Sequence, residues 1–371
     1  MNIIIMVYNL TGGGAERVAS LWANGFAQSG HAVTVITEIS DDKQLTYDIS
    51  SKVKINPISI NNTIFRRLIR VLGLYHLQFK YRLRRLLIKL KPDICIGVMG
   101  KYALDAYKCS RDLNCKIINT EHNAYDRPGF FKERPDIIKM KYQTNKLFDC
   151  VTVLTEADTK VPGVPLDNIF VLPNPLAYTP TNIIPNKDKT ILAVGRLDVW
   201  EVKGFDVLIN AWGSIAVRYP DWKLIIAGTG SEKSKRYLQK LANNYNLKSQ
   251  IEFVGFCNDI YELYRSSSIF VLSSRYEGFG LVLVEAMSQG CACIACDFNG
   301  RQKEIIQNDT QGIICETGDV SALIRAIKKM IEDDLYRENC RVHAVERAKF
   351  YTIENIMERW STIFKKIDLK C

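Results

Sequence analysis

Ser273-Ser-Arg-Tyr-Glu-Gly-Phe-Gly-Leu-Val-Leu-Val-Glu-Ala-Met-Ser-Gln-Gly290 is the stretch around which the rest of the sequence is organised. The apolar run 269–272 before it predicts a buried strand, and residues 281–289 keep good helix formers up to Gly290, a natural stop. Gly278 and Gly280 interrupt the connection, so its backbone can approach a ligand closely. The expected order is strand, glycine-containing loop and helix.

The start of this helix predicts an anion site flanked by two carboxylates. A helix N-terminus presents unpaired N–H groups and the positive end of the helix dipole. Glu277 precedes the helix and Glu285 lies more than one turn into it, so a rise of about 1.5 Å per residue puts the carboxylates about 10 Å apart. This layout suits the hydroxyls of a nucleoside diphosphate sugar. The alternative is a surface loop and an amphipathic helix with two solvated glutamates.

Glu277-Gly-Phe-Gly with Glu285 eight positions later resembles the E-x7-E signature of GT-B glycosyltransferases, in particular the retaining GT4 group. The resemblance continues through residues 291–297, 300–306, 312–314 and 318–319 and is weaker in the N-terminal half. It implies two Rossmann-like domains facing a cleft, with the donor held mainly by the second domain. It also implies that Glu285 holds the ribose hydroxyls and Glu277 the sugar hydroxyls. The other donor contacts expected in this loop are Gly278, Phe279, Gly280 and Leu281.

Arg196 and Lys203 are the expected diphosphate contacts. Residues 190–195 predict a strand and residues 205–218 a helix, so Gly195-Arg196 and Lys203-Gly204 bracket the loop between them. This resembles the family's G-R…K-G pair, in which arginine offers a bidentate fork to phosphate and lysine a movable charge. Lys203 follows Arg196 by seven residues, a longer spacing than usual. The alternative is two exposed basic residues in a loop.

The N-terminal half adds candidate contacts at Gly13, Gly14 and His122. Residues 3–37 predict a strand, a glycine loop, a helix and a second strand, as in a doubly wound sheet. In the resemblance, Gly13 and Gly14 lie near the phosphates and acceptor; the alternative is a structural turn. His122 follows the predicted strand 116–120 at the edge where open α/β sheets bind ligands. It matches by position the family histidine that touches the donor sugar, although a lone histidine is more often structural.

A proline-rich segment divides the chain. Residues 172–185 carry four prolines and no periodicity, which predicts a linker. We therefore expect an acceptor-side domain at residues 1–175 and a nucleotide-sugar domain at residues 186–350. Residues 351–371 carry a last amphipathic helix, which crosses back to the first domain in the resembled fold. Docking on its own domain is the alternative.

Base recognition and metal use are addressed by two further patterns. Residues 253–256 resemble the family segment where backbone groups meet the base, which implicates Val254, Gly255 and Phe256. Backbone recognition leaves little side-chain trace, so uracil is expected only as the commonest choice in the family. The chain has no D-x-D triplet, and we expect no metal or other cofactor. Its three cysteines between 291 and 296 lie in a strand-like apolar run and are predicted to be buried thiols.

Composition narrows the class of protein. A length of 371 residues favours two domains, and a net charge of +10 indicates an acidic partner. Eleven scattered cysteines and a first strand without a basic leader favour a cytoplasmic protein with reduced thiols. No apolar run approaches the ~18 residues that span a bilayer, so the expectation is a soluble or peripheral protein. Nucleic-acid binding is disfavoured because no reading motif accompanies the basic residues.

The function predicted from these patterns is transfer of a hexose or N-acetylhexosamine from a nucleotide sugar to an acceptor hydroxyl. Retention of anomeric configuration is implied by the resemblance alone. No residue is an obvious general base, so catalysis is expected to be electrostatic and positional. The alternatives are a sugar-nucleotide epimerase or hydrolase of the same fold and a non-catalytic binding subunit.

A basic segment predicts where the acceptor is. Residues 64–91 contain nine Lys or Arg and no Asp or Glu, with apolar residues every three or four positions. One or two helices with an apolar stripe opposite a basic face are expected. We expect that face to rest on the anionic inner face of the cell membrane, near a lipid-diphosphate-linked glycan; the alternative is a solvated basic face. The basic residues are Arg66, Arg67, Arg70, Lys80, Arg82, Arg84, Arg85, Lys89 and Lys91.

Overall fold

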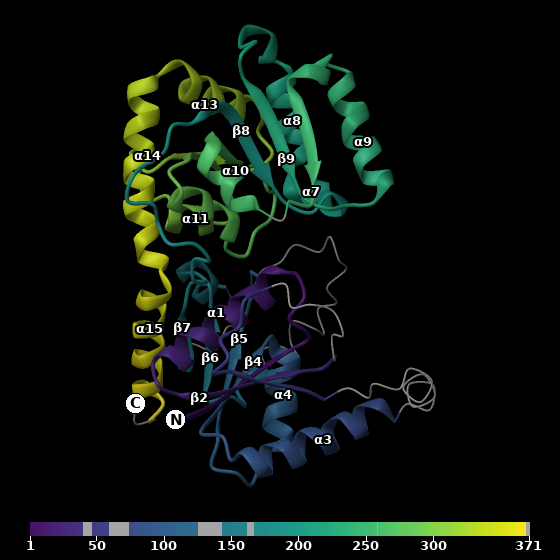
Figure 1. The fold of residues 1–371 in the computed structure, drawn as a ribbon, viewed down its shortest axis with the longest axis vertical. Helices are drawn as coiled ribbons and strands as arrows, with labels where there is room; N and C mark the ends of the chain where they lie inside the picture. Colours follow the sequence, from purple (N-terminus) through teal and green to yellow (C-terminus); the bar gives the residue numbers. More distant parts are fainter. Residues whose placement is uncertain (40–46, 59–73, 125–142, 162–166, 258, 369–371) are drawn as a thin grey trace. The chain divides into compact units, whose positions relative to one another are not determined.

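The computed structural model describes residues 1–39, 47–58, 74–124, 143–161, 167–257 and 259–368. The chain divides into two compact units, one formed by Met1–Ala177 with Ile353–Cys371 and the other by Tyr178–Thr352. The division falls within the proline-containing segment 172–185 (Figure 1). Each unit contains one parallel sheet with helices on both faces, as the sequence predicts.

The first unit contains a seven-stranded sheet in the order β3-β2-β1-β4-β5-β6-β7. All of its strands pair in parallel. Its strands are β1 (Asn2–Val7), β2 (Ala32–Thr37), β3 (Lys54–Pro57), β4 (Ile94–Val98), β5 (Lys116–Thr120), β6 (Cys150–Val153) and β7 (Ile169–Val171). Its helices are α1 (Gly14–Gln28), α3 (Tyr75–Leu90), α4 (Gly100–Cys109), α6 (Glu156–Thr159) and α15 (Ile353–Lys366). The short strand β3 has no clear sequence signal, because three of its four residues are polar or proline.

Helices α3 and α4 cover one face of this sheet, where Phe79, Leu83 and Leu87 share a core with Ile4 and Met6 of β1. Helix α15 packs against α1. Trp360 meets the edge of Trp22 at 5.2 Å between ring centroids, and Phe364 stacks on Phe26 at 5.7 Å. The last helix therefore belongs to the N-terminal unit, as in the resembled fold.

The second unit contains a six-stranded parallel sheet in the order β10-β9-β8-β11-β12-β13. Its strands are β8 (Asp188–Val194), β9 (Lys223–Ala227), β10 (Ile251–Gly255), β11 (Ser267–Leu272), β12 (Ala292–Asp297) and β13 (Ile313–Glu316). Its helices are α7 (Trp200–Lys203), α8 (Phe205–Gly213), α9 (Glu232–Asn243), α10 (Ile260–Ser266), α11 (Leu281–Ser288), α12 (Arg301–Ile305), α13 (Val320–Glu332) and α14 (Asp334–Ala348). One core joins α8, α9 and α13 to the sheet, while α11 and α14 lie against β12. Chain order reverses between β8 and β11, which is where such sheets bind ligands.

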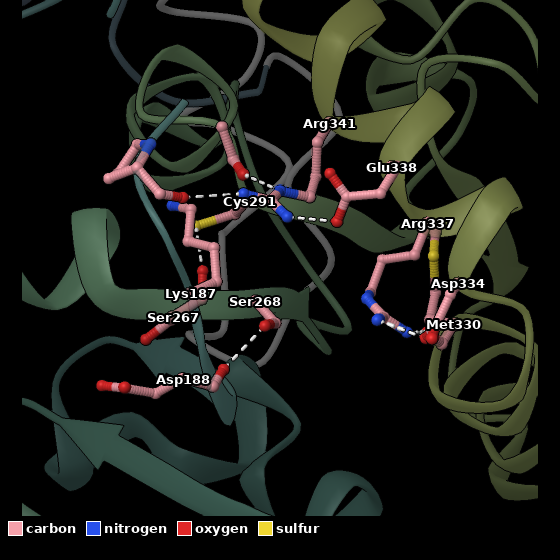
Figure 2. Close-up of polar contacts among 12 residues, drawn as sticks. Lys187, Asp188, Ser267, Ser268, Cys291, Met330, Asp334, Arg337, Glu338 and Arg341 are labelled. Atoms are coloured by element: carbon pink, nitrogen blue, oxygen red, sulfur yellow. Dashed lines mark hydrogen bonds and ion pairs between the residues drawn. The ribbon is translucent and has the colours of Figure 1, made fainter. Parts of the chain in front are cut away.

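Two basic side chains fix the end of α11 that is remote from its glycine loop. Lys187 Nζ donates to the carbonyls of Tyr264 (2.8 Å) and Gln289 (2.7 Å). Arg341 Nε donates to the carbonyl of Gly290 (3.1 Å) and its Nη2 to that of Pro185 (3.0 Å). Figure 2 shows Lys187 and Arg341 close to Cys291, whose thiol donates to the Tyr264 carbonyl at 3.1 Å. Cations at helix C-termini satisfy carbonyls that lack a partner within the helix, so α11 is held firmly at this end.

Candidate active site

The loop between β11 and α11 forms the centre of the site in the second unit. Gly280 precedes α11 with a φ of 97°, a conformation that favours glycine, and an added Cβ would lie 3.1 Å from Leu272. The half-buried Glu277 points its Oε1 at two donors: the Ser274 hydroxyl at 2.9 Å and Lys203 Nζ at 2.5 Å. The structure therefore brings together Glu277 and Lys203, two of the predicted site residues separated by 74 positions.

The segment between Arg196 and Lys203 is not the loop that the sequence predicts. Residues 197–199 form a 3-10 turn, and α7 follows as one turn of helix that ends at Lys203. These two turns take up the extra residues of the long G-R…K-G spacing. The unusual spacing therefore leaves Lys203 in contact with Glu277 and does not move it out of the site.

Contacts from the β11–α11 loop hold α7 in place. The Ser273 hydroxyl donates to the Lys203 carbonyl at 2.9 Å, and the Arg275 backbone N–H donates to the Val202 carbonyl at 2.8 Å. The Arg275 guanidinium forms a bidentate pair with Asp206 at 2.7 Å for both bonds and also donates to the Glu201 carbonyl at 2.6 Å. Sequence reasoning missed Arg275, although it lies inside the quoted stretch, because its partners are about 70 residues away.

Gly204 allows α7 to come this close. Its φ is 62°, and a Cβ there would lie 1.9 Å from the Ser273 carbonyl oxygen. No larger residue fits without separating α7 from the end of β11. The lack of room for a Cβ at this position therefore explains why the K-G pair carries a glycine.

Arg196 differs from Lys203 in that it is exposed, and it forms no ion pair with any residue that the structure describes. Its loop is supported by the segment after β9, because the Leu197 N–H donates to the Thr229 carbonyl at 2.7 Å. Asp198 accepts hydrogen bonds from the Ser231 hydroxyl at 2.6 Å and the Ser234 hydroxyl at 2.9 Å, which lower the pKa of its carboxyl group. The backbone beside Arg196 is fixed while its guanidinium stays available to an anion.

Glu285 lies within α11 and is only 2% exposed. The Tyr264 hydroxyl of α10 donates to its Oε2 at 3.0 Å. Tyr264 is a partner that the sequence could not identify, because α10 and α11 meet only in the folded unit. Phe279, also buried, meets the ring of Tyr351 edge-on at 5.4 Å.

The predicted base-contact segment lies at the carboxyl end of β10. Val254 and Gly255 are the last residues of this strand, and Gly255 has a φ of 70° with open space where a Cβ would be. Phe256 follows with its side chain largely exposed. The segment therefore shares the sheet edge with Arg196 and the β11–α11 loop, because all strands are parallel.

In the first unit, Gly13 and Gly14 form the entry to α1, with Gly13 at a φ of 105° before the first helical residue, Gly14. The N–H groups of this helix start therefore lie at the carboxyl end of β1, beside the point where the strand order of this sheet reverses. The structure confirms the predicted strand, glycine loop and helix. Both glycines belong to the first unit, whereas Glu277, Lys203 and Arg196 belong to the second.

His122 follows β5 in the first unit. Its Nε2 lies 3.0 Å from the Thr120 hydroxyl, and its ring lies 5.5 Å from that of Trp22. Burial lowers the pKa of His122 to about 4, so the ring is neutral at physiological pH. Its Nδ1 is buried without a hydrogen-bond partner in the described structure. The ring can act as a hydrogen-bonding group but not as a cation.

The structure shows the three cysteines of residues 291–296 fully buried, as predicted, and burial raises the pKa of the Cys291 and Cys293 thiols. Ten of the eleven cysteines are described, and all ten are free thiols. Within the described ranges no three His, Cys, Asp or Glu side chains are grouped so that they could hold a metal ion. The helices that the structure describes are too short or too polar to cross a membrane.

Two Rossmann-like units, each with one parallel sheet, have the architecture of GT-B glycosyltransferases. Residues 178–347 match the family model described as glycosyl transferases group 1, and residues 12–176 match glycosyltransferase family 4. The chain belongs to this family of glycosyltransferases.

Three relatives match nearly the whole chain. A Haemophilus influenzae protein named as an uncharacterized glycosyltransferase is 30% identical over 95% of this chain and 96% of its own. The amylovoran biosynthesis glycosyltransferase AmsD of Erwinia amylovora is 27% identical over 95% of each chain. A Campylobacter jejuni enzyme named GalNAc-alpha-(1->4)-GalNAc-alpha-(1->3)-diNAcBac-PP-undecaprenol alpha-1,4-N-acetyl-D-galactosaminyltransferase is 23% identical over 99% of each chain.

Solved structures share the fold. Sucrose-phosphate synthase from Thermosynechococcus elongatus has a TM-score of 0.81 and 19% identity, over 99% of this chain and 98% of its own. HepE of Anabaena in complex with UDP and glucose has a TM-score of 0.77 and 17% identity, over 98% of this chain and 99% of its own. At such identities these structures support the GT-B architecture alone.

Proposed function

We propose that the chain moves a hexose or N-acetylhexosamine from a UDP-sugar to a glycan or lipid-linked glycan, with retention of configuration, in cell-surface polysaccharide synthesis. The observation that carries this proposal is the Lys203–Glu277 pair at the carboxyl edge of the second sheet, beside the N-terminus of α11. A cation and a carboxylate in contact at a helix N-terminus suit a ligand with a diphosphate next to hydroxyls.

The hydrogen-bonding capacity that Lys203 and Glu277 leave unused supports the assigned roles. Lys203 Nζ has three N–H donors and Glu277 takes one, so two remain for diphosphate oxygens. Glu277 receives both of its hydrogen bonds at Oε1, which leaves Oε2 for a sugar hydroxyl. Arg196 supplies a second cation to the diphosphate, and Glu285 binds the ribose hydroxyls. His122 is the proposed hydrogen-bonding contact of the sugar.

In the proposed reaction a bond forms between the anomeric carbon and the acceptor oxygen as the bond to the β-phosphate oxygen breaks. The proton of the acceptor hydroxyl moves to the leaving diphosphate, so no protein base is required. Arg196, Lys203 and the α11 N-terminus stabilise the charge that develops on the leaving group, and the reaction needs no metal ion.

The relatives support the class of donor and acceptor. The name of the Campylobacter enzyme describes a PP-undecaprenol-linked glycan, and that of the Erwinia enzyme the biosynthesis of amylovoran. The Campylobacter name also describes transfer of N-acetyl-D-galactosamine, which belongs to the proposed class of sugars. We accordingly place the chain in the cytoplasm at the inner face of the cell membrane, where a polyprenyl-diphosphate-linked acceptor would be presented.

Thermal shift of the purified chain with a panel of nucleotide sugars tests the donor. We expect one UDP-sugar to raise the melting temperature more than free UDP does, and turnover of that sugar only when an acceptor glycan is added. Turnover without any acceptor would indicate an epimerase or hydrolase. No shift with any nucleotide sugar would contradict the proposed function.

A further inference from the structure

Helix α3 has an apolar outer face that the sequence did not predict. The expectation was one apolar stripe facing the sheet and a basic face opposite. The inner stripe is present, with Phe79, Leu83 and Leu87 buried in the core. The structure adds a second stripe on the solvent side, formed by Leu74, which immediately precedes the helix, and by Leu77, Tyr81 and Ile88.

The outer stripe gathers four exposed large apolar side chains on one side of a single helix. Leu74, Leu77, Tyr81 and Ile88 are 46%, 66%, 62% and 45% exposed. Their spacings of three, four and seven residues put them on one line along the helix. Exposed apolar side chains gathered on one face can mark an interaction surface.

Cations lie within and beside this stripe. The helix contains five Lys or Arg and no Asp or Glu, and Lys91 follows it. Arg85 lies between Tyr81 and Ile88, with its Cζ 5.9 Å from the centre of the Tyr81 ring. Arg85, Lys89 and Lys91 are exposed and form no ion pair with described residues.

Two of the arginines expected to contact the membrane have structural partners instead. Arg82 donates to the Ile58 carbonyl at 3.0 Å. Arg84 donates to the Cys109 carbonyl at 2.9 Å and pairs with Asp112. Arg66, Arg67 and Arg70 lie outside the described residues. Arg85 and Lys89 are therefore the cations to test.

We propose that the outer face of α3 inserts shallowly into an anionic lipid bilayer, with Leu77, Tyr81 and Ile88 at the level of the headgroups and acyl chains and Arg85 and Lys89 on lipid phosphates. This names the surface that would bring the proposed lipid-linked acceptor to the enzyme, and it rests on that proposed function. Exposed apolar side chains with cations among and beside them, and no acids in the helix, match an interfacial helix. A nucleic acid would be met by a face made mainly of cations, whereas the exposed face of this helix carries four large apolar side chains.

The expected contribution of the cations follows from their number. One Lys or Arg near an anionic surface changes the partition coefficient about fivefold, so removing the Arg85 and Lys89 charges lowers it about 25-fold, and reversing them lowers it further. Salt should weaken the binding of the wild-type chain, but only in part, because the apolar contact is not screened.

Flotation of the full chain with vesicles tests the proposal. Vesicles of phosphatidylcholine with phosphatidylglycerol should carry the wild-type chain, and vesicles of phosphatidylcholine alone should carry much less. Arg85→Glu with Lys89→Glu should abolish flotation. The stripe variant, Leu77→Ser with Tyr81→Ser and Ile88→Ser, should reduce it at least tenfold even though all cations remain.

Matched controls lie on the second unit. Lys233→Glu with Lys240→Glu reverses two exposed charges of α9, and Val217→Ser with Leu335→Ser removes two side chains that are 84% and 85% exposed. Both controls should float like the wild-type chain. All variants should keep the wild-type thermal shift with the UDP-sugar, since none touches the donor site.

Three outcomes would overturn the proposal: no flotation of the wild-type chain with anionic vesicles, wild-type flotation of the stripe variant, or binding of a DNA duplex that the charge reversal abolishes while vesicles are ignored. A chain that responds to a UDP-sugar but never floats refutes the surface alone. A chain that floats but responds to no nucleotide sugar refutes the proposed function alone.

Discussion

Replacing Arg275 by alanine should lower turnover, although this residue has no predicted contact with the substrate. Arg275 makes three hydrogen bonds of 2.6–2.7 Å to Asp206 and to the Glu201 carbonyl, and these hold α7 against the β11–α11 loop. Lys203 is the last residue of α7. The predicted defect is therefore a misplaced Lys203.

The size of the effect follows from these bonds. A hydrogen bond to a charged group is worth about 1.5–3 kcal/mol, but the Arg275 and Asp206 side chains are 33% and 22% exposed, so water screens the pair. We take about 2 kcal/mol for the whole interaction. That is about a 30-fold fall in the equilibrium constant between the anchored and the released segment, because every 1.4 kcal/mol is tenfold. Turnover should fall by up to about 30-fold, and binding of free UDP much less.

The fall in turnover of Arg275→Ala is measured by steady-state kinetics with the UDP-sugar found by thermal shift. Arg275→Lys keeps the charge but loses the bidentate geometry and should fall between alanine and wild type. Arg265→Ala is the matched control, because Arg265 makes an exposed pair of 3.4 Å with Glu262 in the same unit. It should leave turnover unchanged.

A double mutant separates positioning from general damage. If Arg275 acts through Lys203, Arg275→Ala should cost little more once Lys203→Ala is present. Independent, additive losses in the double mutant would refute the reasoning, as would wild-type turnover in Arg275→Ala itself.

Four further predictions concern the site. Glu285→Ala should weaken binding of the nucleotide sugar by about 1.5–3 kcal/mol, and unchanged affinity in calorimetry would remove Glu285 from the ribose site. Arg196→Ala and Lys203→Ala should lower kcat more than they weaken binding of the free nucleoside; wild-type kcat in both would exclude them from the mechanism. EDTA should leave activity intact, and a loss of activity that Mg²⁺ or Mn²⁺ restores would contradict metal independence. Folding lowers the pKa of His122 from 6.5 to about 4, so the unfolded chain takes up the proton at a higher pH than the folded chain does. The free energy of unfolding should therefore fall as the pH falls from 6.5 to 4, by up to about 3 kcal/mol. Urea unfolding measures the free energy of unfolding at pH 5 and at pH 7.5. The difference between the two values should be smaller in His122→Asn than in the His76→Gln control.

Much of the fold could be predicted because its signals are local. The strand at 269–272, Gly280 and the helix that follows are set by side-chain pattern and by a backbone conformation that favours glycine. The alternation of strands and helices then implied the two doubly wound sheets. The family motifs assigned Glu277 and Lys203 to the same donor site, but the ion pair between them was not predicted and is seen only in the structure.

The features that could not be predicted depend on contacts between distant segments. Helix α7 has four residues and exists because Ser273 and Arg275 hold it, so no periodicity marks it. The hydrogen bond from Tyr264 to Glu285 joins two helices that pack only in the folded unit. In α3, apolar residues every three or four positions fit one stripe or two, and only the packing shows which of them stay exposed.

The position of α15 has a consequence for how the protein is made on the ribosome. The second unit is one continuous piece of chain, so it can close its core as soon as residue 352 has emerged. The first unit begins earlier but waits for the last helix, because Trp360 and Phe364 cover Trp22 and Phe26 of α1. Synthesis at about 5–20 residues per second leaves these α1 aromatics uncovered for tens of seconds, a period in which chaperones would find them. The N-terminal half is translated first and completed last.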